Sequence, residues 1–190
     1  MTNLTVDRQP NNFESNPSIL DVLETDHAEI DRLLQDSMAA INQADVVRTF
    51  EHLDLFWARL AMHIRAEHRW LFPAVRDAAE GSPAEFGHIP EILETLRHDH
   101  DFFMRDLARG VKAMRLVFYF GNDEETLVVV RELLDGVTVR LKDHNRLEEE
   151  SIYTLATKEF LDPAVIGQLL RSIRKELANY PQRFAGSRST

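Results

Sequence analysis

A short step, His-x-x-x-Glu, occurs twice within apolar helical patterns and limits how the chain can fold. It spans His63 to Glu67 and again His144 to Glu148. Positions four apart on an α-helix are offset by only about 40° and lie one turn apart, so the imidazole and the carboxylate project from one face. Because each step lies on the apolar stripe of its segment, we expect the fold to bring both polar steps into one core.

Apolar residues recur every three or four positions in four long segments, a spacing that predicts amphipathic α-helices. The segments span about 18–41, 46–79, 90–120 and 124–155, and a shorter one spans 162–180. Pro73 should bend or end the second helix locally, and residues 80–90 predict a loop. Long helices joined by short turns predict an all-α fold, an up-down-up-down four-helix bundle with a short additional C-terminal helix.

The length of 190 residues suits one domain with tails. We expect an N-terminal tail over residues 1–17, the bundle over 18–158, a C-terminal helix packed on it over 159–180, and a second tail over 181–190. The oligomeric state, monomer or homodimer, stays open at this stage.

Composition excludes several classes of function. The net charge of −10 argues against nucleic acid as a partner, because phosphate binding depends on Lys and Arg. The absence of cysteine excludes thiolate chemistry and means that any metal must be held by nitrogen and oxygen atoms. With no signal-peptide pattern and no run of about 18 apolar residues, we expect a cytoplasmic protein without a membrane partner.

A further histidine precedes each step on the previous predicted helix, at His27 and His100. In antiparallel helices that rise about 1.5 Å per residue, His27 comes level with His63, and His100 comes level with His144, near mid-bundle. The two halves also look duplicated. The matching pairs are Asp26-His27 with Asp99-His100, His63 with His144, Glu67 with Glu148, and Leu71-Phe72 with Ile152-Tyr153.

Four imidazoles and two carboxylates at one level of a core favour a metal centre. An alternative is that the six side chains satisfy one another without metal, but a buried ionised carboxylate costs several kcal/mol unless it is paired or neutralised. Two divalent cations would neutralise both carboxylates. Imidazole with carboxylate suits Fe, Mn, Zn or Co rather than Ca or Mg, and bridging carboxylates are typical of di-iron bundle cores. Iron is the expected metal, with Zn or Mn as substitutes.

The order His, His-x-x-x-Glu, His, His-x-x-x-Glu over about residues 18–158 resembles the hemerythrin-like proteins, or HHE cation-binding domains. The resemblance implies a non-haem di-iron centre with a bridging oxo or hydroxo group and two bridging glutamates. The implied ligands are His27, His63, Glu67, His100, His144 and Glu148.

The sequence departs from the oxygen-carrying hemerythrins at two positions. Those proteins have a second histidine four residues after the first in the third helix, where this chain has Met104. They also use a carboxylate five residues after the last histidine, which here is Glu149, whereas helical geometry and the duplication favour Glu148. The smaller number of histidines argues against reversible oxygen carriage, and the choice between Glu148 and Glu149 stays open at this point.

Three more residues are candidates for contacts that orient the ligands. His68 and Glu149 directly follow the two glutamates of the steps, and solvated helix faces are the alternative, favoured account of both. His98 lies two positions before His100. A two-residue offset points His98 to a different helix face, which makes it the weakest of the three. The sequence assigns no catalytic residue.

The leading functional prediction is a di-iron protein that binds, senses or reacts with a small oxidant: oxygen, hydrogen peroxide or nitric oxide. Six protein donors for two metals leave coordination positions for such a ligand, and catalase-like peroxide disproportionation would make the protein an enzyme. One alternative is iron storage, iron delivery or iron–sulfur repair, although hemerythrin-like repair proteins usually carry a cysteine-bearing domain. A second alternative is a redox-responsive signalling module that uses the C-terminal helix.

Overall fold

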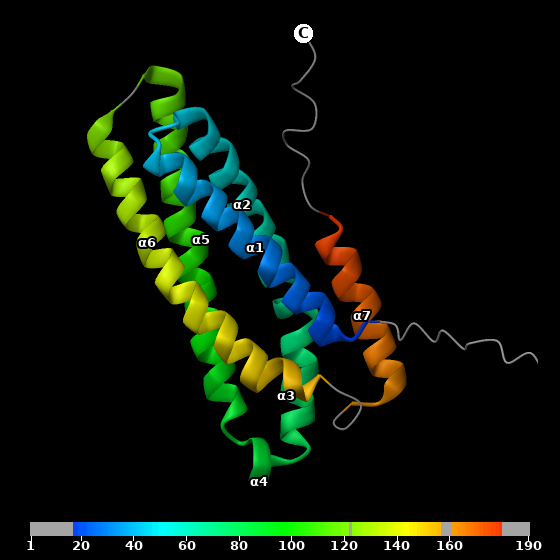
Figure 1. Ribbon diagram of the computed structural model, residues 1–190. Coiled ribbons are helices and arrows are strands. Elements are labelled where there is room, and N and C mark those ends of the chain that lie inside the picture. Colours follow the sequence, from blue (N-terminus) through cyan, green and yellow to red (C-terminus); the bar gives the residue numbers. More distant parts are fainter. Residues whose placement is uncertain (1–16, 122, 157–160, 180–190) are drawn as a thin grey trace, which may run out of the picture.

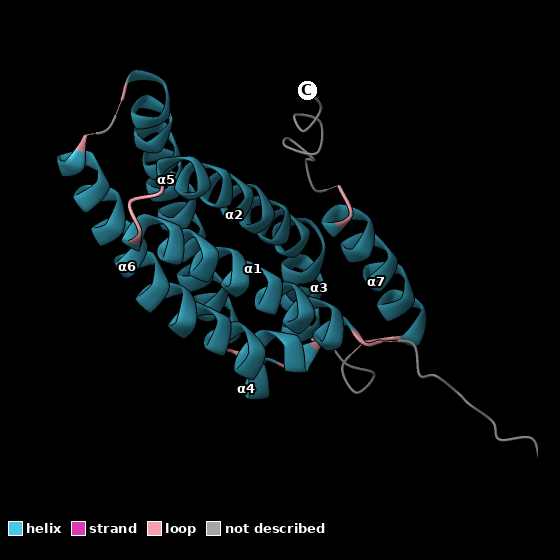
Figure 2. Ribbon diagram, turned by 45° about the horizontal axis from the view of Figure 1, so that its top comes forward, coloured by secondary structure: helices cyan, strands magenta, loops and turns pink. Residues whose placement is uncertain are grey.

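The computed structural model describes residues 17–121, 123–156 and 161–179. Within these ranges the chain forms helices and short connections and contains no strand, which confirms the predicted all-α class. Figure 2 shows the helices and the short loops between them. The predicted tails over residues 1–17 and 181–190 lie almost wholly outside the described residues, with only Pro17 included.

Four long helices form the body of the molecule: α1 (Ile19–Asn42), α2 (Val46–Ala66), α5 (Ile89–Phe120) and α6 (Glu124–Leu147). In Figure 1 they run side by side as a bundle, with α1 against α2, α2 against α5, α5 against α6, and α6 against α1. The helices begin where the sequence offers caps. Ser18 and Asp21 form a capping box, and Asp45 accepts a hydrogen bond from the Arg48 amide.

The second and fourth predicted helices change geometry at the glutamates of the two steps. A π-helical turn, η1 (Glu67–Leu71), follows α2, and another, η2 (Glu148–Ile152), follows α6. The irregularity therefore begins at Glu67 rather than at Pro73. Pro73 instead lies in the first turn of α3 (Phe72–Glu80), where its missing amide proton costs no helical hydrogen bond.

Two short elements complete these segments. The four-residue helix α4 (Pro83–Phe86) lies within the connection 80–90, which was predicted to be a loop. Its brevity explains the miss, because a single turn leaves no apolar period in the sequence. After η2 the chain forms a 3₁₀ turn, η3 (Tyr153–Leu155).

Apolar side chains fill the bundle in two separate clusters. One includes Ile30, Phe56, Phe103 and Leu134, and the other includes Leu23, Phe72, Leu96, Ile152 and Ile173. On each long helix, the two clusters are separated by the histidine or the His-x-x-x-Glu step that the sequence places there. The candidate site is therefore a polar layer between two apolar regions.

The last described helix, α7 (Pro163–Leu177), packs against α2, η1 and α1 at one end of the bundle (Figure 1). Ile173 is fully buried in the second apolar cluster. The carboxylate of Glu176, also buried, accepts a charged contact from Arg65 at 2.8 Å. No helix in the described part of the chain is long and apolar enough to span a membrane.

Replacing Ile173 by Ala tests whether α7 belongs to the folded core. Removing this buried side chain should lower the free energy of unfolding by roughly 2–5 kcal/mol, because transfer and cavity costs add. The exposed Val165 on the same helix provides the control, and Val165→Ala should change it by less than about 0.5 kcal/mol. Urea denaturation measures both variants. Equal stabilities would show that α7 adds little to the core.

Candidate metal centre

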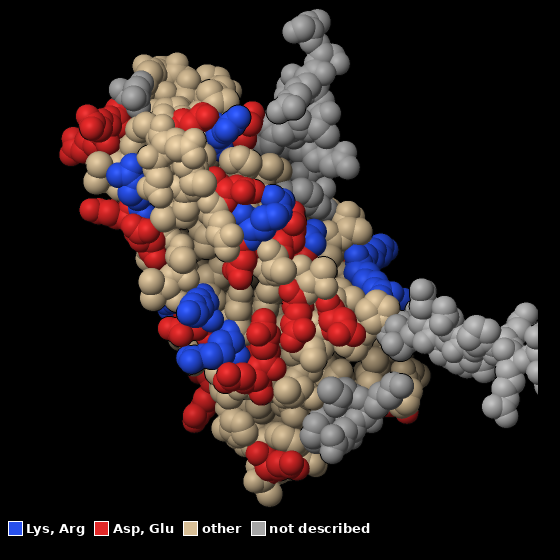
Figure 3. Space-filling view, viewed as in Figure 1, with Lys and Arg blue, Asp and Glu red and all other residues tan. Residues whose placement is uncertain are grey.

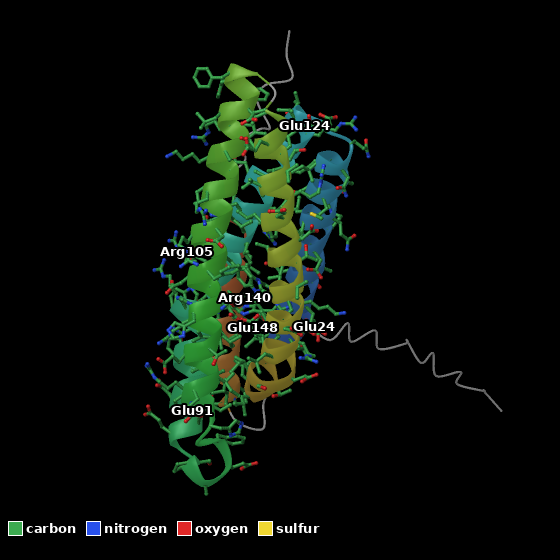
Figure 4. The ribbon with its side chains drawn as sticks, turned by 90° about the vertical axis from the view of Figure 1, so that its left-hand side faces the viewer. Glu24, Glu91, Arg105, Glu124, Arg140 and Glu148 are labelled. Carbon is green, nitrogen blue, oxygen red and sulfur yellow. The ribbon has the colours of Figure 1, made fainter. Side chains whose placement is uncertain are left out.

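The six candidate ligands meet in the polar layer between the apolar clusters. They come from four helices and two π turns, and all of them are buried: His27, His63, Glu67, His100, His144 and Glu148. In Figure 4, Glu148 lies below Arg140, toward the lower end of the helix that begins as α6. The sequence-predicted residues therefore do come together, although their binding of metal stays a prediction.

The imidazoles form two pairs, one from each half of the duplicated sequence. The Nε2 atoms of His27 and His63 are 3.1 Å apart, and those of His100 and His144 are 2.9 Å apart. Two nitrogen atoms about 3 Å apart fit adjacent positions around one ion that binds each at about 2.1 Å. Each pair thus has the spacing of one metal position.

Glu148 lies between the two pairs. Its Oε2 atom is 3.3 Å from Nε2 of His27, and its Oε1 atom is 3.1 Å from Nε2 of His144. The two oxygen atoms of Glu67 are placed in the same way. Oε1 lies 3.4 Å from Nε2 of His63, and Oε2 lies 3.4 Å from Nε2 of His100. Both carboxylates therefore direct one oxygen atom to each pair, as a bridging carboxylate would.

Two acidic residues contact the Nδ1 atoms of two candidate ligands, the ring nitrogen atoms on the side away from the centre. Asp26 Oδ2 lies 2.8 Å from Nδ1 of His63, and Asp99 Oδ2 lies 3.2 Å from Nδ1 of His144. Arg59 in turn donates to Asp26, and Arg140 donates to Asp99. A proton on Nδ1 that is donated to a carboxylate leaves the Nε2 lone pair free to face the centre.

The other two imidazoles have different outer partners. Nδ1 of His27 is 2.9 Å from Glu149 Oε1, and Nδ1 of His100 is 2.8 Å from Nε2 of His68. His68 and Glu149 thus contact two candidate ligands rather than lying on fully solvated helix faces. His98 is exposed on α5, and no hydrogen bond joins it to the centre within the described chain, so its role stays a prediction. Its two-residue offset from His100 turns it outward.

Tyr153 is the residue that the sequence reasoning missed. Its buried hydroxyl donates to Glu67 Oε1 at 2.9 Å, and it also lies 3.0 Å from Nε2 of His27. In a regular α-helix a residue five positions after Glu148 would point away from it. The π turn of η2 instead bonds the Tyr153 amide to the Glu148 carbonyl and brings the two side chains together. A tyrosine five residues after a buried glutamate was therefore the available signal.

One difference between the two similar halves makes the surroundings of the two histidine pairs unequal. Phe72 corresponds to Tyr153, and its ring stacks on His100 with centroids 5.8 Å apart. The hydroxyl of Tyr153 is therefore present only beside the His27 and His63 pair.

Burial and charge shift the proton equilibria of the centre. Burial and the carboxylates of Glu148 and Glu67 raise the pKa of Tyr153 well above its usual range. Burial opposes the charge on Glu148, but the His144 charge and hydrogen bonds from the imidazoles hold its pKa well below its usual range. The phenol therefore keeps its proton while the Glu148 carboxylate stays ionised.

The residues fit a pair of metal cations. Oε2 of Glu67 is buried and accepts no well-aligned hydrogen bond within the described chain, and Oε1 of Glu148 has the imidazoles of His100 and His144 at 3.5 and 3.1 Å. Buried polar atoms normally have a partner, and buried carboxylates need positive charge. Two groups bring their donor atoms within 4.8 Å of one another: His27, His63 and Glu148, and His100, His144 and Glu148. Two cations shared by Glu148 would supply both the partner and the charge.

The pKa of His144 predicts how the stability of the metal-free protein changes with pH. Burial lowers the pKa of its imidazole, but the charge on Glu148 and hydrogen bonds to Asp99 and Glu148 raise it from 6.5 to about 9. Because folding raises this pKa, the stabilisation is complete below pH 6.5 and is lost as the pH rises through about 9. The free energy of unfolding should fall by up to about 3 kcal/mol across this range, as measured by urea denaturation.

A His144→Gln variant is the control for this effect, since it has no titrating ring at the position. An equal fall in its stability over the same pH range would assign the effect to another group. Protons also compete with metal for His144, so apparent metal affinity should rise over this pH range.

The comparisons with known proteins agree with this geometry. The model of the hemerythrin HHE cation binding domain matches residues 18–156. Comparisons with curated proteins and with solved structures gave no match. The matched region includes all four long helices and all six buried candidate ligands. This chain belongs to the hemerythrin HHE cation-binding domain family.

Proposed function

We propose that this protein holds two iron ions in the polar layer and reacts there with a small oxidant. The observation that carries the proposal is the pair of buried carboxylates, each with one oxygen atom toward each histidine pair. The donor set of imidazole and carboxylate suits iron, and a carboxylate shared between two ions is typical of di-iron centres in helix bundles. We further propose the up-down-up-down order for the four long helices, supported by the packing of each on its neighbour in the chain.

The small size of the substrate follows from the surroundings of the centre. The candidate ligands lie between two apolar clusters, and both bridging glutamates are fully buried. Six protein donors shared by two ions leave coordination positions open, and only a molecule of a few atoms would fit there. Oxygen, hydrogen peroxide and nitric oxide meet this condition.

When bound, iron supplies redox chemistry that none of the side chains provides. The side chains of the protein orient the candidate ligands and supply a proton to the substrate. Asp26 and Asp99 fix the imidazoles of His63 and His144 through their outer nitrogen atoms. Burial and the two carboxylates keep the proton on the Tyr153 hydroxyl beside the His27 pair, where it can donate a hydrogen bond to an oxygen atom of the substrate.

Hydrogen peroxide is the most direct oxidant to test, because its disproportionation is balanced without another reactant. One peroxide molecule takes up two electrons and two protons and becomes two water molecules. The second gives up the same electrons and protons and becomes dioxygen. The centre would need only to pass electrons between them while side chains hold the protons.

Replacing His144 by Ala tests the metal pair. Protein loaded anaerobically should contain about two iron ions per chain by elemental analysis, and His144→Ala should lose at least one of them. His98→Ala is the matched control, because this exposed histidine lies outside the centre. Peroxide-dependent oxygen release should follow the metal content. A wild-type protein that is folded but binds no metal would contradict the proposal.

Replacing Tyr153 by Phe tests the proton donor and copies the residue that Phe72 supplies in the other half. The variant should keep its metal content, while peroxide turnover falls roughly 10²-fold, the usual contribution of a general acid. Tyr119→Phe changes an exposed tyrosine and should leave turnover unaltered. Unchanged turnover in Tyr153→Phe would remove this residue from the reaction.

A further inference from the structure

A groove of about 830 Å³ lies between α1 and α6 at the level of the centre. Its lining includes His27 and Glu149, the candidate ligand and its outer partner. Figure 4 shows Glu24 of α1, which also lines the groove, at nearly the same height along the bundle as Glu148. The groove therefore reaches from the surface to the outer side of one metal ligand.

Asn145 lies in the groove wall without a partner. Its exposed fraction is 8%, and its side chain forms no hydrogen bond within the described chain. A buried amide normally has both its donor and its acceptor engaged. The position directly after His144 therefore presents an oxygen atom and an NH₂ group to whatever passes along the groove.

The duplicated sequence explains why there is space on this face. The equivalent positions on the opposite face, between α2 and α5, are occupied by large apolar residues. Counted from the matching histidines, Thr138, Asn145 and Asp31 correspond to Trp57, Ile64 and Met104. Those three apolar side chains pack in or against the first cluster. Small or polar residues at the corresponding places leave the space that forms the groove.

The charge of the groove favours a cation. Four acidic residues line it, against two basic ones: Glu24, Asp31, Asp135 and Glu149, with Lys142 and Arg146. In Figure 3, which views the α1 and α6 face, acidic side chains gather over the lower part of these two helices, with a few basic ones beside them. A cleft lined mainly by one sign of charge raises the local concentration of the opposite ion. It offers no such attraction to a neutral oxidant.

We propose that the groove between α1 and α6 is the route by which a hydrated divalent metal cation reaches the centre. Asp31 and Asn145 offer oxygen atoms that replace water molecules of the ion before His27 takes it up. The inference rests on the proposed function, because it presumes that the centre binds metal.

The test is the rate at which metal-free protein takes up Co²⁺, followed by stopped-flow absorption of the bound ion. In the double variant Thr138→Trp and Asn145→Ile, the groove carries the residues of the closed face. Its uptake should be slower by at least about tenfold, with the same final stoichiometry. Asp31→Asn removes one groove charge at nearly constant shape and should also slow uptake, with a weaker dependence on salt.

Glu132→Gln is the matched control, because it removes one negative charge from an exposed position on α6 outside the groove lining. Its uptake rate should equal that of the wild type. If the double variant and Asp31→Asn both take up Co²⁺ at the wild-type rate, the proposed route is wrong. The same holds if Glu132→Gln slows uptake as much as Asp31→Asn does, since that result assigns the effect to overall charge.

Two further outcomes separate this inference from the proposed function. Groove variants that load normally but react slowly with peroxide would overturn the cation route and make the groove a path for the oxidant. A wild-type protein that binds no Co²⁺, even at long times, would count against the metal centre itself. Should the double variant fail to fold, as seen by circular dichroism, Asp31→Asn alone decides the question.

Discussion

The burial of two carboxylates in an apolar core is the constraint on which this structure depends. Glu67 and Glu148 are fully buried, and their carboxylates contact imidazoles and the Tyr153 hydroxyl rather than water. Such charges are tolerated only where positive charge compensates them. In the metal-free protein the charged imidazole of His144 supplies part of that compensation, which is why its pKa is raised. Bound cations would supply it fully and would allow the imidazoles to be neutral ligands.

The two π turns place the buried carboxylates between the histidine pairs. Each begins at one of the buried glutamates, so the helix widens where its carboxylate must face both histidine pairs. Such turns are uncommon and often mark functional sites. Here the turn at Glu148 also brings Tyr153 over the centre. The local helical distortion and the buried phenol are therefore parts of one arrangement.

Duplication followed by divergence gives the centre two different sides. The ligands of the two halves match one for one, yet Tyr153 faces one pair and Phe72 the other. The outer faces differ as well, since Asn145 borders a groove while its counterpart Ile64 packs in the core. A nearly symmetric set of candidate ligands thus has unequal surroundings, with a buried hydroxyl beside one histidine pair and a groove beside one pair of helices.

The sequence alone determined the helical class and the six residues that meet in the core. Periods of three and four residues reflect the burial of one helix face, and the repeated spacing of His and Glu fixes which side chains share that face. Helix ends at Ser18, Asp45 and Gly121 follow from capping and from the positive φ of Gly121, which are local properties. Tertiary structure decided the rest. Whether His68 contacts the centre while His98 does not, where Tyr153 points, and which face stays open all depend on packing between helices that are distant in the chain. Local periodicity assumes regular α-helix, and it therefore misses the π turns that begin at Glu67 and Glu148.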